Sequence, residues 1–140
     1  MKRYNKVFFL VQFFFYLVIG LSPFLNKLQA QIAIGKPTFP FTQICANPSF
    51  NTFDVNFSFT PTSGITASNQ FIVEMSDGNG SFAKPTVVYT SVAGAITTSP
   101  AKITFSVPVT TSGEAYRLRI RSTSPAATSQ LSIPFPAYYK

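Results

Sequence analysis

The sequence of 140 residues contains no histidine, no tryptophan and a single cysteine. Carboxylates are also scarce, and the chain has only four of them: Asp54, Glu74, Asp77 and Glu114. Acid–base catalysis needs a positioned pair of titratable groups, and a nucleophile needs an activating base beside it. This composition therefore argues against an enzyme, and we expect no catalytic residue, no cofactor and no metal site.

The lone cysteine, Cys45, excludes an internal disulfide and any metal site built from several thiolates. Its neighbour Ile44 is apolar, and a free cysteine usually behaves as a small buried apolar residue. We favour that structural role over a reactive thiol, because nothing nearby in the sequence supplies a positive charge. A disulfide between Cys45 and a cysteine of another chain is the alternative that the sequence leaves open.

The formal net charge of +7 is concentrated near the N-terminus, because Lys2, Arg3, Lys6 and Lys27 all precede residue 30. The remaining chain has seven basic and four acidic residues, a net charge of +3. So modest a charge does not favour nucleic acid as a partner.

Residues 1–30 have the features of a helical secretory signal peptide. A basic head at 1–6 precedes an apolar run at 7–19, and the small residue Ala30 stands before Gln31. We predict cleavage between Ala30 and Gln31, which would place the protein at the cell surface or in the extracellular medium.

The alternative for the leader is a retained membrane anchor. Residues 7–25 approach the ~20 apolar residues that cross ~30 Å of hydrocarbon. Gln12 and Pro23 interrupt this stretch and favour the cleaved signal. Contact with a membrane would therefore require that the leader stays uncleaved.

The clearest structural pattern lies at residues 52–60, where apolar and polar side chains alternate strictly. This period of two predicts a strand with one buried face. Weaker patterns predict further strands at 70–76, 86–89, 102–107, 115–122 and 129–133. The residues that we expect in the core are Phe53, Val55, Phe57, Phe59, Phe71, Val73, Phe105, Tyr116, Leu118 and Ile120.

Proline and glycine divide the chain after the leader. Residues 31–50 are rich in proline and predict a lead-in with one edge strand. Residues 51–136 predict a β-sandwich domain, and residues 137–140 predict a tail or the start of a linker. The run Asp77-Gly78-Asn79-Gly80 predicts a tight turn, because the carboxylate pattern of a calcium loop is incomplete there.

About seven short strands without helical periodicity predict an all-β fold, an antiparallel sandwich of the immunoglobulin or fibronectin type III kind. The stretch Tyr116-Arg117-Leu118-Arg119-Ile120-Arg121-Ser122 resembles the penultimate strand of such sandwiches. In that strand the leading tyrosine often makes a hydrogen bond at a corner of the fold. The resemblance implies that Tyr116 is the corner residue.

A longer set of stretches resembles modules of the gliding-motility-associated surface proteins that the type IX system secretes in Bacteroidota. These stretches are 71–77, 80–82 with Pro85, the strand at Tyr116 running into Ser124-Pro125, Ile44-Cys45 and Ala30-Gln31. The resemblance covers most of residues 31–136. It implies a structural or adhesive role, with neighbouring domains or other surface proteins as partners. Proteins of that group are longer and finish with a C-terminal secretion domain, so we expect this chain to be the first part of a larger protein.

Arg117, Arg119 and Arg121 are predicted to lie on the outer face of one strand, which suggests a second function. Such a row could bind a glycan or a polyanion, and the candidate stacking surfaces are Tyr89, Tyr138 and Tyr139. The competing explanation is that alternating arginines keep a strand soluble and discourage unwanted pairing.

Overall fold

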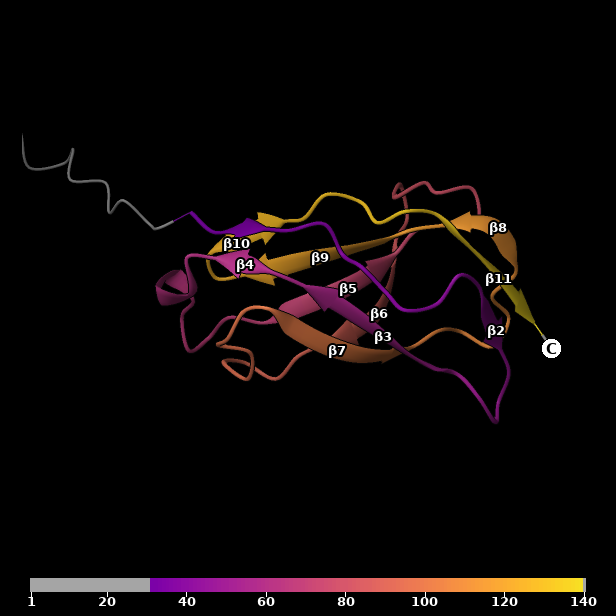
Figure 1. The fold of residues 1–140 in the computed structure, drawn as a ribbon, viewed down its shortest axis with the longest axis horizontal. Coiled ribbons are helices and arrows are strands. Elements are labelled where there is room, and N and C mark those ends of the chain that lie inside the picture. The colour runs from indigo at the N-terminus through magenta and orange to yellow at the C-terminus, as the bar shows by residue number, and fades with distance from the viewer. Residues whose placement is uncertain (1–30, 140) are drawn as a thin grey trace, which may run out of the picture.

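The computed structural model describes residues 31–139, and the predicted signal peptide lies outside this range. The described residues form strands β1 to β11 and one turn of 3-10 helix, Thr62–Gly64 (Figure 1). The strands are arranged in several sheets, and all but one of the strand pairs are antiparallel. The prediction of an all-β fold is therefore confirmed.

The first layer contains the predicted strand at 52–60. Its main part, β3 (Thr52–Phe57), pairs with β7 (Ala101–Ser106). After a break at Ser58 the chain continues as β4 (Phe59–Thr60), which pairs with β1 (Ala33–Ile34). The strict alternation of side chains keeps one face of this run buried on both sides of the break.

The second layer consists of two sheets that one run of chain connects. β5 (Phe71–Met75) lies between β6 (Thr86–Thr90) and β9 (Leu118–Thr123), and β9 also pairs with β10 (Ala126–Thr128). The predicted strand at 115–122 is interrupted at Arg117, so that its first part belongs to the neighbouring sheet.

That neighbouring sheet is built around the C-terminal strand. β11 (Phe135–Tyr139) pairs antiparallel with β8 (Gly113–Tyr116) and parallel with β2 (Ile44–Ala46). The prediction of a tail or linker at 137–140 is thus wrong for Ala137 to Tyr139. β structure also continues past both predicted limits of the sandwich domain at 51 and 136.

The prediction of a tail was based on the prolines near the C-terminus, which usually disfavour a strand. Pro136 lies inside β11 although it has no N–H to donate. The register of β11 against β8 shifts between Phe135 and Ala137, and such an irregularity accommodates a proline within a sheet. Ala137 is completely buried, so this segment belongs to the core.

The core lies between the two layers. Phe57 and Phe59 of the first layer contact Phe71 of the second, with ring centroids 5.1 and 4.9 Å apart. All ten residues predicted for the core are buried, and each is 9% exposed or less. The two layers therefore pack face to face through an interior of aromatic and aliphatic side chains.

The predicted strand at 129–133 is not a strand, although the segment runs beside β9. The backbone N–H of Ser132 donates to the carbonyl of Leu118, and the hydroxyl of Ser132 accepts from the Leu118 N–H, both at 2.9 Å. Ser129 makes the same two bonds to Ile120, also at 2.9 Å. We call each such residue a serine clamp, because its hydroxyl takes the place of a ladder carbonyl.

Two further serine clamps lie elsewhere in the second layer. Ser76 binds the backbone of Arg117, and Ser91 binds the backbone of Phe71, with hydrogen bonds of 2.8–2.9 Å. Ser76 and Ser91 are each 2% exposed. Buried backbone N–H groups that lack a ladder partner are therefore satisfied by side chains at these positions.

Candidate functional site

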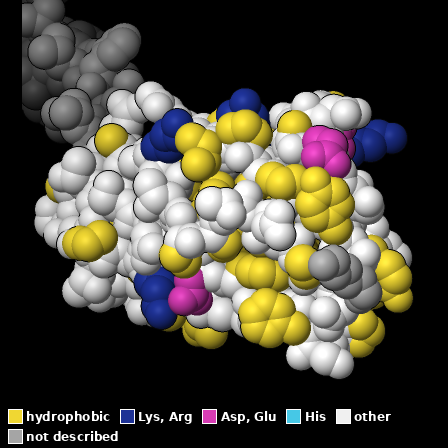
Figure 2. Space-filling view, turned by 45° about the vertical axis from the view of Figure 1, so that its right-hand side comes forward, with side chains coloured by type: hydrophobic (Ala, Val, Ile, Leu, Met, Phe, Trp, Pro, Cys, Tyr) yellow, Lys and Arg dark blue, Asp and Glu magenta, His cyan; other side chains and the backbone are white. Residues whose placement is uncertain are grey.

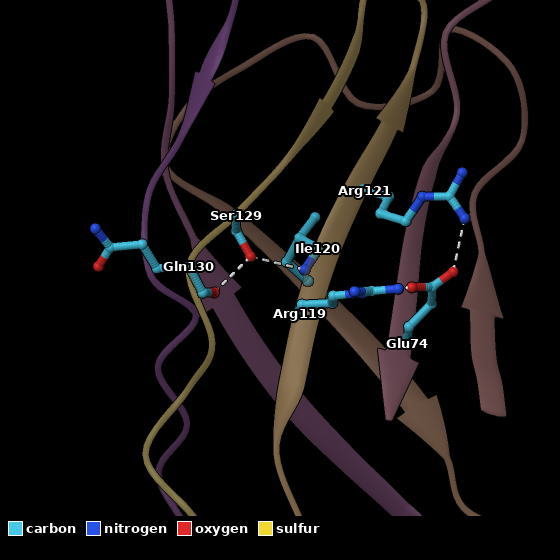
Figure 3. A network of polar contacts seen from close by, with 6 residues as sticks. All are labelled: Glu74, Arg119, Ile120, Arg121, Ser129 and Gln130. Carbon is cyan, nitrogen blue, oxygen red and sulfur yellow. Dashed lines mark hydrogen bonds and ion pairs between the residues drawn. The ribbon is translucent and has the colours of Figure 1, made fainter. Parts of the chain in front are cut away.

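The candidate partner-binding residues Arg117, Arg119 and Arg121 do not form one continuous row. Arg119 and Arg121 both turn toward Glu74 on β5, as Figure 3 shows. Arg117 stands at the break between β8 and β9, and its Nη1 donates to the carbonyl of Ser132 at 2.9 Å. The structure thus brings two of the three predicted arginines together and leaves the third in a structural contact.

Glu74 is the centre of this cluster. Its Oε2 accepts a hydrogen bond from Nε of Arg119, and its Oε1 accepts one from Nη1 of Arg121, both at 2.7 Å. In the antiparallel register Arg119 lies directly opposite Glu74, and Arg121 lies opposite Ile72. One arginine is thus a direct neighbour of the carboxylate and the other a diagonal neighbour, which are the two positions that long side chains reach.

Glu74 is buried although it lies on the outer face of β5. Its side chain is only 3% exposed, whereas those of Arg119 and Arg121 are 24% and 44% exposed. The carboxylate does point away from the core, but the two arginine side chains cover it. Long side chains shield a shorter one in this way when their aliphatic stems lie along the sheet.

The electrostatics of Glu74 combine two opposing effects. Burial raises the pKa of the carboxyl, whereas the hydrogen bonds and charges of Arg121 and Arg119 lower it. The arginines prevail, so the pKa of Glu74 lies below its ordinary value and the group is ionised at neutral pH. Glu74 therefore compensates one of the two positive charges beside it.

An aromatic ring completes the cluster. The guanidinium carbon of Arg119 lies 4.5 Å from the centroid of Phe82, which is within the range of a cation–π contact. Phe82 lies in the connection between β5 and β6 and is half-buried. Arg119 is thus held between a carboxylate and a ring, while Arg121 keeps more of its surface in solvent.

The carboxylates of Asp54 and Glu114 do not take part in the Glu74 cluster, and each has its own hydrogen-bond partners. Asp54 accepts from the Thr104 hydroxyl at 2.6 Å and pairs with Lys102 at 3.2 Å on the first layer. Glu114 accepts from the Tyr138 hydroxyl at 2.9 Å. Each of these groups takes part in its own local contact.

The turn predicted at residues 77–80 is confirmed. The Oδ1 atom of Asp77 accepts hydrogen bonds from the backbone N–H groups of Asn79 at 3.0 Å and Ser81 at 2.8 Å. Gly80 has a φ of +85°, which a residue with a side chain rarely adopts. Residues 31–139 contain no group of three metal-ligating side chains close enough to hold an ion.

A groove on the surface was absent from the sequence-based expectations. An open groove of about 460 Å³ runs between β1 and β10, and no charged side chain lines it.

Cys45 is half-buried on the edge strand β2. Within the described part of the chain, no helix is long and apolar enough to span a bilayer.

Comparisons with protein-family models, curated proteins and solved structures gave no match for this chain. A function for this chain is therefore argued from its own residues and from their geometry.

Proposed function

We propose that this chain is an exported, non-enzymatic β-sandwich module with a structural or adhesive role at the cell surface. The arrangement of the chain is the observation that carries this proposal. Its described part begins at one end of the long axis and finishes, after β11, at the opposite end (Figure 1). A module built in this way can be joined end to end with others and separate its neighbours by its full length.

The sandwich that we propose is of the immunoglobulin or fibronectin type III kind. The corner contact that the resemblance implies supports this assignment, since the Tyr116 hydroxyl donates to the carbonyl of Ser112 at 3.2 Å. In such sandwiches the corresponding tyrosine binds the backbone a few residues upstream. Two packed layers with mainly antiparallel strands are consistent with the same class.

A structural role also agrees with how the polar groups are used. Glu74 is occupied by two arginines, Asp54 by Lys102 and Thr104, and Asp77 by its own turn. A catalytic pair needs two titratable groups that converge on one place where a substrate can sit. The contacts of these carboxylates favour a module without an active site.

Export and family are proposed from the sequence. The leader at 1–30, the predicted cut between Ala30 and Gln31 and the resemblance together favour the first module of a larger gliding-motility or type IX secretion-associated protein. Its partners would then be the neighbouring domains of that protein or other surface proteins. We do not expect nucleic acid as a partner, since the net charge after the leader is modest.

Processing of the leader tests this proposal. The full chain is expressed in a Gram-negative host, and the N-terminus and intact mass are measured in medium, envelope and cytosol. We expect a product that begins at Gln31 outside the inner membrane. Ala30→Leu should block the cut, because the residue before a cleavage site has to be small, and Ala33→Leu is the matched control. A chain that retains residues 1–30 in the inner membrane would refute cleavage and favour the anchor.

A further inference from the structure

The outer face of the second layer combines two guanidinium groups with apolar surface. Arg119 and Arg121 project from β9 toward Glu74 on β5. Val87 of β6 is the register partner of Glu74 and is 55% exposed, and Phe82 lies against Arg119. We call these five residues the arginine face. Figure 2 draws one side of the domain, where charged side chains are few and several hydrophobic side chains are exposed among polar ones.

The arginine face retains a positive charge and unused donors. One carboxylate stands between two guanidinium groups, so the group as a whole is cationic. A guanidinium has five N–H donors, and Glu74 accepts one from each arginine. Within residues 31–139 Arg119 and Arg121 make no other side-chain hydrogen bond. Arg121, at 44% exposure, can therefore offer a pair of N–H groups to an anionic ligand.

The two arginines are also held in place before any ligand arrives. Glu74 fixes both guanidinium groups, and Phe82 holds the plane of Arg119. A side chain that is already ordered loses less conformational entropy on binding than a free one does. Arg119 thus acts as a positioning residue, and Arg121 is the residue that would touch the ligand.

The position of this face in the sheet indicates which anionic ligand fits. β5 and β9 each have a paired strand on both sides, so their backbone groups are used in the ladder. An extended peptide usually binds at a free strand edge, which in this sheet is β6 or β10, whereas both arginines lie on the interior strand β9. A sugar ring with an acidic substituent needs only charged donors and an apolar surface, and Val87 supplies that surface beside the arginines.

We propose that the arginine face binds an acidic polysaccharide, with Arg121 on a carboxylate or sulfate group and Val87 against the ring. Such binding depends on the fold of this face alone. It would hold whether or not the protein is exported or belongs to a longer chain.

Affinity electrophoresis of the purified protein tests the proposal with four polymers: polygalacturonate, dextran sulfate, neutral dextran and the acidic polypeptide polyglutamate. We expect an acidic polysaccharide to retard the wild type and neutral dextran to leave it unchanged, and the two acidic polysaccharides distinguish carboxylate from sulfate. Arg121→Gln should weaken retardation about fivefold, which corresponds to one exposed charge-assisted contact. Lys102→Gln removes one charge from the opposite layer, and its side chain is 63% exposed. This control should change retardation less than twofold.

Each of three results would overturn the proposal. The first is that neither acidic polysaccharide retards the protein. The second is that Lys102→Gln weakens binding as much as Arg121→Gln does, and the third is that polyglutamate binds more tightly than polygalacturonate. The first leaves the face without a ligand of this class, the second indicates a general charge effect, and the third indicates an acidic protein partner. If Arg121→Gln unfolds the domain, Arg121→Lys and Val87→Ser replace it. Both should fold, and both should weaken polysaccharide binding because the planar donor pair or the apolar surface is lost.

Discussion

Replacing Ser132 by alanine isolates the contribution of one serine clamp to stability. The Ser132 hydroxyl accepts the N–H of Leu118 at 2.9 Å and donates to the carbonyl of Ile133 at 2.7 Å. Ser132 and Leu118 are both 0% exposed, so water does not reach this N–H in the folded state. Ser132→Ala removes the hydroxyl but leaves the backbone bond from Ser132 to Leu118 in place.

The main cost of Ser132→Ala comes from the N–H that is left without a partner. A buried donor without an acceptor costs about 1–3 kcal/mol, because its interaction with water is lost and not replaced. The void left by one oxygen atom is small by comparison. We therefore expect the free energy of unfolding to fall by about 1–3 kcal/mol. For a domain of this size that corresponds to a fall of about 4–13 °C in the melting temperature.

Urea unfolding followed by far-ultraviolet circular dichroism measures this change, since the chain has no tryptophan to report by fluorescence. Ser106→Ala is the matched control, because Ser106 is exposed on β7 and its loss should change stability by less than about 0.5 kcal/mol. Hydrogen exchange adds a local measurement, since the Leu118 amide should lose protection in Ser132→Ala. Equal stability of the two variants, with Leu118 still protected, would refute the serine clamp as a stabilising contact.

Two further substitutions test the candidate site and the corner contact. Glu74→Gln should lower the free energy of unfolding at pH 7 by about 1–2 kcal/mol, because two partly exposed arginines lose the charge they share. The pKa of Glu74 is lowered from 4.5, so its ion pairs are complete above about pH 4.5 and are lost as the pH falls through the lowered pKa. The stability difference between wild type and Glu74→Gln should therefore shrink below pH 4.5 in urea titrations, and a difference independent of pH would contradict this account. Tyr116→Phe should lower stability by about 0.5–1.5 kcal/mol at an unchanged urea m-value, because it removes one hydrogen bond to Ser112 and keeps the ring against Phe135. No change in the urea midpoint would show that the corner contact contributes nothing.

The burial of single residues was predictable wherever it follows from local alternation. Phe53, Val55 and Phe57 share one side of β3 because successive side chains of any strand point to opposite faces. Such a pattern needs no knowledge of which strand lies next to it. By the same rule Glu74 lies on the face of β5 opposite Phe71 and Val73, but alternation alone does not account for its burial.

The burial of Glu74 depended on register. Arg119 and Arg121 are far from Glu74 in the sequence, and only the pairing of β5 with β9 brings them together. Opposite charges on two predicted strands were visible in the sequence, but a shift of one residue would have put them on opposite faces. The separation of Arg117 from the other two arginines has a similar cause, since it follows from the passage of the chain between two sheets.

Local sequence patterns were sufficient to predict the all-β class, the inward faces of the main strands and the turn at 77–80, because alternation and turn chemistry act between near neighbours. Local patterns did not predict that Phe135–Tyr139 forms a strand between β2 and β8, or that Ser129 and Ser132 bind β9 through their hydroxyl groups. A proline-rich segment becomes a strand when distant strands offer it partners, and a serine becomes a clamp when a backbone N–H without a partner lies beside it. Both outcomes depend on contacts between residues far apart in the chain, and no local pattern encodes them.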